Sequence, residues 1–192
     1  MFRTHTCGEL RKSHEGQTVT LAGWVHRRRD HGGLIFIDLR DRYGLTQIFS
    51  DPKEHADAHA IMNDVRSEFV VQITGVVRAR PANSVNGDLE TGGIEILVTK
   101  VSVLNASKTP PFEIDVDKDI NEEVRLKYRY LDIRRERMKT NLVMRHQVIK
   151  FIRDFMDTKQ FIEVETPMLV KGTPEGSREY VVPSRLYPGK FY

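Results

Sequence analysis

Five short runs of β-forming residues occupy the first half of the chain, and this pattern limits its possible folds more than any other feature. The runs cover residues 18–26, 34–39, 45–49, 69–80 and 94–104. In the first run, TVTLAGWVH, apolar and polar residues alternate, as in a strand with one buried face. Turn-forming residues, Gly32-Gly33 and Asp41-Arg42-Tyr43-Gly44, separate the first three runs. Each run is therefore predicted to be a strand.

One helix is predicted between the third and fourth strands. Asp51-Pro52 opens this stretch, which continues to about Arg66 and has proline at a first helical position. A polar loop, PANSVNGDLETGG, separates the fourth strand from the fifth. This order of five strands and a helix is that of the OB-fold, a Greek-key barrel whose face and loops bind oligonucleotides. SH3-like barrels and other small β modules share parts of the pattern, so strand order alone leaves them open.

The pattern changes after residue 106. Residues 107–133 are predicted to form a linker, and Pro110-Pro111 makes its beginning stiff and extended. Residues 134–159 are predicted to form an amphipathic helix. Its apolar residues recur at helical spacing: Met144, Val148, Ile149, Ile152, Phe155 and Met156. Residues 161–164 are predicted to form a short strand that ends at Thr166-Pro167.

Composition is typical of a soluble globular protein, with 39% hydrophobic and 30% charged residues. No apolar run approaches the roughly 20 residues that span a bilayer, and the N-terminus lacks the apolar core of a signal peptide. The single cysteine, Cys7, cannot form an internal disulfide and is predicted to be a small buried residue. We therefore expect a cytoplasmic protein without membrane association.

Metal and hydrolase chemistry find no support in the motifs. The seven histidines show no metal-ligand spacing with Cys7 and no HExxH pattern. His55 and His59 are four residues apart on the predicted helix, but a surface pair is the simpler interpretation. The sequence contains neither a P-loop nor a Gly-x-Ser-x-Gly motif. We expect no metal site.

Basic and aromatic residues gather at the ends of the predicted strands. Arg27-Arg28-Arg29 follow the first strand, beside the strand that contains Phe36, and Arg78 and Arg80 end the fourth. Guanidinium groups can contact phosphates while aromatic rings stack on unpaired bases. The net charge is only +3, so nucleic-acid binding would depend on such local clusters. Solvated surface arginines and a core phenylalanine remain an equally supported interpretation.

A separate candidate lies near the end of the chain. Glu175 belongs to the stretch TPEGSREY at 173–180, and Gly172 and Gly176 give this stretch turn chemistry. A carboxylate on such a loop can bind an ammonium group, and closure of the loop would exclude water. Spacing alone favours an exposed acidic loop.

The sequence resembles bacterial aspartyl-tRNA synthetases over essentially its whole length. Two matching stretches lie in the predicted barrel: GWVHRRRD at 23–30 and LIFIDLRDRYGLTQIF at 34–49. Two more follow it: RLKYRYLDIRR at 125–135, and ETPMLVKGTPEGSREYVVPSR at 165–185 with GKFY at the end. Asparaginyl and lysyl relatives share the short barrel motifs, whereas the last two blocks and the TPEGSREY loop favour the aspartyl family.

The resemblance implies a β barrel followed by an incomplete α/β domain. It assigns residues 1–106 to an OB-fold anticodon-binding domain and residues 107–133 to a linker. Residues 134–192 become the N-terminal part of a class II catalytic domain, with motif 1 and a substrate loop. Complete members are homodimers that use ATP and Mg²⁺ to convert L-aspartate to aspartyl-AMP, and then transfer aspartate to the 3′ end of tRNA-Asp.

These 192 residues lack class II motifs 2 and 3, on which catalysis depends in the family. We therefore expect the chain to bind tRNA without catalysing, to contain no catalytic residue, and to bind neither ATP nor Mg²⁺ well. A free-standing tRNA anticodon-binding module is the alternative. A general single-strand-binding OB protein would leave residues 125–192 unexplained.

The resemblance also assigns anticodon-binding residues within the barrel. Phe36 matches the aromatic residue that stacks on an anticodon base. Gln47 and Glu95 match polar residues that read base edges. Arg29 and Arg78 match basic contacts to the anticodon loop.

Four further positions carry expectations from the family. Glu175 matches the carboxylate that meets the α-ammonium group of aspartate, and Pro167 matches the motif 1 proline of the dimer interface. His31, directly after Arg-Arg-Arg-Asp, is the residue type of relaxed members that charge both tRNA-Asp and tRNA-Asn. Asn83 aligns with the second position linked to this discrimination.

Overall fold

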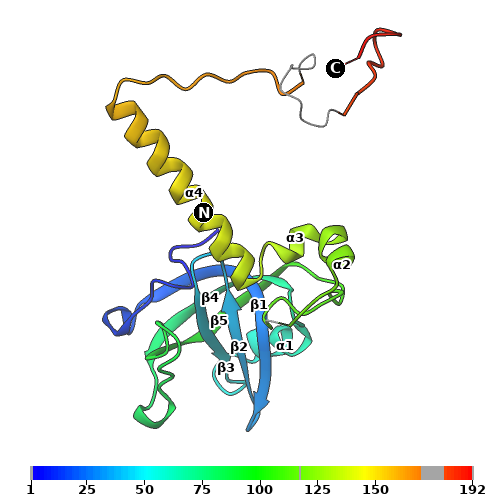
Figure 1. Ribbon diagram of the computed structural model, residues 1–192. Helices are drawn as coiled ribbons and strands as arrows, with labels where there is room; N and C mark the ends of the chain where they lie inside the picture. Colours follow the sequence, from blue (N-terminus) through cyan, green and yellow to red (C-terminus); the bar gives the residue numbers. More distant parts are fainter. Residues whose placement is uncertain (1, 117, 170–179, 192) are drawn as a thin grey trace. The chain divides into compact units, whose positions relative to one another are not determined.

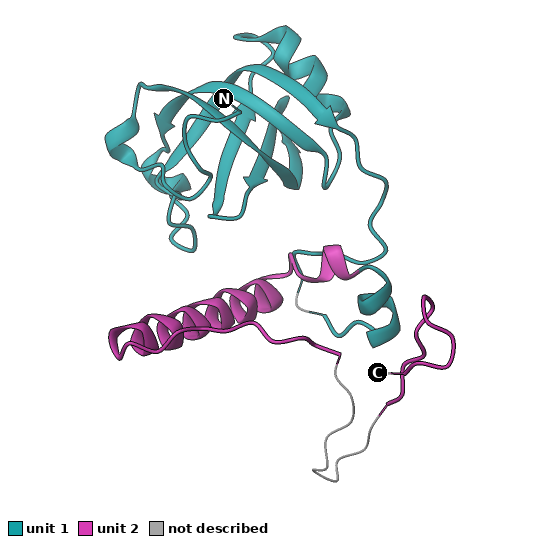
Figure 2. Ribbon diagram, turned by 90° about the horizontal axis from the view of Figure 1, so that it is seen from above, with its two compact units in different colours: residues 1–128 teal, residues 129–192 magenta. Residues whose placement is uncertain are grey.

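The computed structural model describes residues 2–116, 118–169 and 180–191 (Figure 1). These residues form two compact units, Met1–Tyr128 and Arg129–Tyr192, which are coloured separately in Figure 2. Glu175, the predicted aspartate ligand, lies outside the described residues. None of the helices in the described ranges is both long and apolar enough to cross a membrane.

Unit 1 is built around a closed five-stranded barrel (Figure 1). Its strands are β1 (Thr18–His31), β2 (Leu34–Arg40), β3 (Leu45–Ser50), β4 (Val70–Ala79) and β5 (Ile94–Asn105). Their order around the barrel is β1-β2-β3-β5-β4, and all neighbours are antiparallel except β3 and β5. The five predicted strands and the OB-fold are therefore confirmed, but β1 extends to His31, beyond its predicted end at residue 26, so Arg27-Arg28-Arg29 lie within the strand and pair with β2.

The interior of the barrel follows the alternation in the sequence. On β2, for example, Ile35, Ile37 and Leu39 are buried in the core, so Phe36 and Asp38 project from the opposite face. Cys7 is fully buried in the same core, as predicted, and this burial raises the pKa of its thiol. The outward-facing side chains of the strands thus lie outside the core, and the exposed ones among them are available for binding.

The β1–β2 hairpin turns at Gly32 and Gly33, as the sequence predicts. Both residues have positive φ angles, 60° and 81°, a backbone conformation that glycine adopts without the steric cost of a Cβ. The tight turn places Arg29 opposite Phe36 on the neighbouring strand. Two residues predicted to bind RNA are thereby brought together.

Helix α1 is Ala56–Asp64, so its predicted start at Pro52 is wrong. The Asp51 carboxylate accepts the backbone N–H of Lys53 at 2.8 Å, and the Asp51 carbonyl accepts that of Glu54 at 3.2 Å. This aspartate-stabilised turn competes with helix formation and delays it by one turn. Short 3₁₀ helices η1 (Lys12–His14) and η2 (Ala82–Ser84) lie elsewhere in unit 1.

Short helices follow the barrel. Helix α2 (Glu122–Lys127) belongs to unit 1, and its N-cap residue Asn121 accepts the backbone N–H of Glu123 at 2.9 Å. Helices α3 (Arg129–Asp132) and α4 (Glu136–Thr158) belong to unit 2. The long amphipathic helix predicted at 134–159 is therefore confirmed as α4, although its apolar side chains are exposed.

The strand predicted at 161–164 is wrong. Residues 161–167, including Pro167, are exposed and have no regular secondary structure, and the side chain of Ile162 is 87% exposed. A β-strand needs a neighbour for its backbone N–H and C=O groups. In the described part of unit 2, the only isolated bridge pairs Pro183 with Phe191, so local β propensity does not produce a strand.

Candidate nucleic-acid interface

Cross-strand pairing gathers the predicted anticodon residues on one outer face of the barrel. Arg29 pairs with Phe36 across β1 and β2, and Asp38 pairs with Gln47 across β2 and β3. A surface pocket of about 650 Å³ lies there, lined by Arg29, Asp30, His31, Phe36, Gln47, Arg80, Pro81, Ser84 and Glu95. Five of the seven candidate residues in the barrel thus share one pocket.

Hydrogen bonds connect the polar residues of this pocket. Arg29 Nη2 donates to Asp38 Oδ1 at 2.7 Å and to Gln47 Oε1 at 3.3 Å. Gln47 Nε2 donates to Glu95 Oε2 at 3.0 Å. Because both ends of the Gln47 amide have partners, its oxygen is directed towards Arg29 and its nitrogen towards Glu95. The network links β1, β2, β3 and β5 and orients its polar groups before any ligand binds.

Glu95 is a half-buried carboxylate in this network. Burial raises its pKa, while Arg80, the hydrogen bond from Gln47, and Arg78 act in the opposite direction. Burial removes part of the water around the Glu95 carboxylate, and the basic neighbours partly compensate for that loss by stabilising its charged form. Such a group can accept hydrogen bonds from the N–H groups on a base edge.

Arg80 belongs to the pocket, although no individual role could be predicted for it. It is only 8% exposed, and its Nε donates to the carbonyl oxygen of Ile94 at 2.9 Å. Its Nη2 is buried and has no hydrogen-bond partner among the described residues. Burial lowers the pKa of Arg80, and Glu95 opposes this effect. An unpaired donor beside a pocket favours an acceptor on a ligand.

Sequence reasoning could identify Arg80 only as part of a basic pair with Arg78 at the end of a strand. The structure separates the two arginines. Arg80 lines the pocket, whereas Arg78 is absent from its lining. Strand alternation would place the two arginines on one face. The burial of Arg80 depends instead on the loop between β4 and β5, in which the carbonyl oxygen of Ser84 accepts a hydrogen bond from Arg80 Nη1 at 3.5 Å.

Arg78 makes different contacts. Its Nη1 and Nη2 donate to the two carboxylate oxygens of Glu54 at 3.0 and 2.8 Å. Its Cζ lies 6.0 Å from the centroid of the Phe49 ring. The Phe49 ring in turn stacks against Phe36, with centroids 5.9 Å apart and an interplanar angle of 22°.

The two candidate discrimination residues flank the same pocket. His31 lines it directly. Asn83 belongs to η2, and its side-chain oxygen accepts a hydrogen bond from the hydroxyl of Ser84, another lining residue, at 3.4 Å. The β1–β2 turn and the β4–β5 loop thus each bring one of the two positions to this site.

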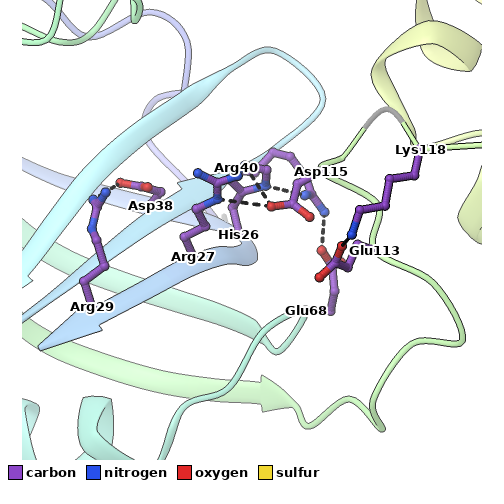
Figure 3. Close-up of polar contacts among 9 residues, drawn as sticks. All are labelled: His26, Arg27, Arg29, Asp38, Arg40, Glu68, Glu113, Asp115 and Lys118. Carbon is purple, nitrogen blue, oxygen red and sulfur yellow. Dashed lines mark hydrogen bonds and ion pairs between the residues drawn. The ribbon is translucent and has the colours of Figure 1, made fainter.

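A second polar cluster lies further back along β1 (Figure 3). Asp115 Oδ2 accepts a hydrogen bond from Arg27 Nε at 3.1 Å and lies 3.9 Å from His26 Nε2. Arg40 donates to His26 Nδ1 and to Glu68 Oε1, both at 2.7 Å. Burial and Arg40 lower the pKa of His26. This cluster attaches the segment around Asp115 to the barrel within unit 1.

Two family models match successive parts of the chain. The model for the OB-fold nucleic acid binding domain matches residues 19–104. The model for class II tRNA synthetases (D, K and N) matches residues 121–192. The first match contains the barrel except for its first and last residues, together with the pocket, and the second begins at the N-cap of α2.

Curated relatives match the whole chain. It is 56% identical over 191 residues to the aspartate–tRNA(Asp/Asn) ligase of Rubrobacter xylanophilus, covering 100% of this chain and 32% of the relative. It is 55% identical over 190 residues to the aspartate–tRNA(Asp/Asn) ligase of Heliobacterium modesticaldum, covering 99% of this chain and 31% of the relative. The chain thus spans about a third of the length of these relatives.

Solved structures agree with this match. Asparaginyl-tRNA synthetase from Pyrococcus horikoshii superposes with a TM-score of 0.76 at 26% identity, over 88% of this chain and 39% of that one. A putative aspartyl-tRNA synthetase from Leishmania major shares the fold, with a TM-score of 0.80 at 20% identity over 98% and 38% of the two chains. Sequence and fold together show that the chain belongs to the class II aspartate–tRNA ligase family and corresponds to its N-terminal portion, an OB-fold domain followed by the beginning of the synthetase domain.

Proposed function

We propose that the barrel binds the anticodon loop of tRNA-Asp for an aspartate–tRNA ligase. The observation that carries this proposal is the pocket in which Arg29, Phe36, Gln47 and Glu95 meet. It combines an aromatic platform, polar groups held by hydrogen bonds, and arginine side chains. Single-stranded RNA loops are recognised by these elements: stacking on bases, hydrogen bonds to base edges and cationic contacts to phosphates.

Five of the nine lining residues have proposed roles that their contacts support. Phe36 offers a half-exposed ring for stacking on a base. Gln47 and Glu95 hold polar groups in fixed directions for the base edges. Arg29 is half exposed and supplies a cation at the rim, and Arg80 Nη2, which has no partner in the described part of the chain, supplies a buried donor.

We also propose that the enzyme accepts tRNA-Asn in addition to tRNA-Asp. His31 lines the pocket, and Asn83 accepts a hydrogen bond from Ser84, which also lines it, and this proximity supports a shared role in discrimination. The relatives from Rubrobacter and Heliobacterium carry the name aspartate–tRNA(Asp/Asn) ligase. Negligible charging of a tRNA-Asn transcript by the full-length enzyme would contradict this proposal.

The reaction itself belongs, in our proposal, to the whole protein. It would activate L-aspartate with ATP to form aspartyl-AMP and then esterify the 3′ end of tRNA, in the cytoplasm and as a homodimer. Glu175 is proposed to bind the α-ammonium group of aspartate, and Pro167 to belong to the dimer interface. Among the described residues, no three metal-ligating side chains cluster.

Binding to an anticodon stem-loop tests the proposal. The 192-residue chain is titrated with the tRNA-Asp stem-loop, with single-base anticodon variants, and over a salt series. We expect tight binding that is lost when anticodon bases change, and tolerance of the tRNA-Asn anticodon if specificity is relaxed. Binding that ignores the anticodon and only weakens with salt would mean backbone electrostatics alone, and the base-reading roles would be withdrawn.

A further inference from the structure

Phe49 is buried on the outer face of the barrel, outside its core. Its side chain is 7% exposed, yet it does not belong to the hydrophobic cluster inside the barrel. It pairs with Phe36 across β2 and β3, and the two rings are stacked. The position of the Phe36 ring is therefore constrained by Phe49, which a base in the pocket would not contact directly.

Arg78 holds Phe49 from a third strand. Its guanidinium group lies over the Phe49 ring, and its two terminal nitrogens are engaged by Glu54. An arginine held in a bidentate pair keeps its plane and direction better than a free one. Arg78 does not line the pocket, so its hydrogen bonds to Glu54 do not compete with contacts between the pocket and a base.

Glu54 is itself fixed by the turn that follows β3. The backbone N–H of Glu54 bonds to the carbonyl oxygen of Asp51, and the Asp51 side chain holds Lys53. The Glu54–Arg78 pair is about half exposed, with side-chain exposures of 41% and 44%. Such surface pairs contribute little to stability. The main effect of the Glu54–Arg78 pair is therefore to hold the Arg78 guanidinium group in place over the Phe49 ring.

We infer that Arg78, held by Glu54, is a positioning residue that fixes the base-stacking ring of Phe36 through Phe49, and that it does not contact RNA phosphates. The expected effect on RNA binding rests on the proposed anticodon function, whereas the positioning of the Phe36 ring does not. It departs from the expectation that Arg78 contacts the anticodon loop directly. A fixed ring binds a base more tightly because less motion is lost on binding.

Salt dependence separates a positioning role from a phosphate contact. Arg78→Met is expected to weaken stem-loop binding about two- to fivefold, the size of an exposed cation–π contact, with an unchanged slope of log affinity against log salt. Loss of a phosphate contact would instead lower the slope by about 0.7 for single-stranded RNA. Arg11→Met is the matched control, since Arg11 is also 44% exposed and paired with a glutamate, Glu90.

A double-mutant cycle tests the route through the rings. In a Phe36→Leu chain, Arg78→Met should have no further effect on affinity, because the ring on which it acts is gone. Full additivity of the two substitutions would overturn the inference. Glu54→Gln should weaken binding in the same direction as Arg78→Met, whereas tighter binding would mean that Glu54 competes with phosphate for Arg78.

The free chain provides a test that needs no RNA. The ¹³C–¹H resonances of the Phe36 ring should shift in Arg78→Met and Glu54→Gln but not in Arg11→Met. Unchanged Phe36 resonances would overturn the inference even if RNA binding changes. If the wild-type chain ignores the anticodon sequence, the proposed function fails, and these resonances still decide whether Arg78 positions Phe36.

Discussion

The side-chain amide of Gln47 donates a hydrogen bond to the Glu95 carboxylate at 3.0 Å. The two residues come from β3 and β5, the strands that pair in parallel and close the barrel. Closure of the barrel is therefore also what builds the polar part of the pocket.

Glu95→Gln should reduce both affinity and base discrimination. The substitution preserves shape but replaces a charged acceptor with a neutral amide. Hydrogen bonds to charged groups contribute about 1.5–3 kcal/mol, so we expect binding of the tRNA-Asp stem-loop to weaken roughly 10- to 100-fold. Titration with the native stem-loop and with anticodon variants measures both effects. Equal affinity of wild type and variant for every loop would contradict the base-reading role.

The same carboxylate should make binding dependent on pH. Burial raises the pKa of Glu95 above its ordinary value, so it gains a proton at a higher pH than an exposed glutamate would. Protonation removes an acceptor of base N–H groups, and affinity should therefore fall as the pH decreases through this raised value. Stem-loop titrations over a pH series measure the effect, and Glu95→Gln controls for protonation of the bases. Identical profiles for both proteins would argue against it.

Arg80→Lys should weaken stem-loop binding by about tenfold, within the 1–3 kcal/mol typical of a buried donor left without its partner. Lysine keeps the charge but cannot reproduce both the bond to Ile94 and the unpaired Nη2 donor. Affinity and thermal unfolding are measured together. A loss of stability that accounts for the whole loss of binding would show that Arg80 acts only in the fold.

His26 should make stability fall in mild acid. Its folded pKa lies below the ordinary 6.5 because burial and the cations Arg40 and Arg27 disfavour its charge more than Asp115 and Asp38 favour it. The unfolded chain therefore binds a proton near pH 6.5, whereas the folded chain does so only at lower pH. The free energy of unfolding is at its full value above pH 6.5 and decreases below it.

The difference between wild type and His26→Gln isolates this contribution. Urea unfolding of both chains at several pH values gives the two stability profiles. We expect the variant to lose the additional decrease below pH 6.5, while shared carboxylate titrations cancel. If the stability of both proteins decreased equally below pH 6.5, groups other than His26 would cause the acid sensitivity.

Gly75→Ala should destabilise the barrel by about 1–3 kcal/mol, as overpacking commonly does. A Cβ on Gly75 would collide with the backbone carbonyl oxygen of Leu97 and would lie 2.6 Å from Ile96 Cγ2. Gly87→Ala is the control, because its Cβ would meet no atom within 4 Å. Urea midpoints of the two variants are compared with that of the wild type, and equal midpoints would contradict the close approach of β4 and β5.

Local features of the fold could be predicted because local sequence controls them. Alternation fixed the five strands, helical spacing fixed α4, and paired glycines fixed the β1–β2 turn. The predictions failed where a competing interaction decided the outcome. Asp51 captured the backbone N–H of Lys53 and delayed α1, and residues 161–164 had β propensity without a neighbouring strand.

The sequence by itself determined which residue types were available for binding RNA, and the resemblance to a family indicated where to look. Only the tertiary structure decided how they meet. Gln47 and Glu95 are 48 residues apart, Arg78 and Glu54 are 24 apart, and Arg27 and Asp115 are 88 apart. Strand register and barrel closure set the first contact, whereas the turn after β3 and the segment around Asp115 set the other two. Periodicity along the chain does not specify which distant segments meet. For the same physical reason, only the folded barrel shows that Arg80 is buried and that Arg78 contacts Phe49.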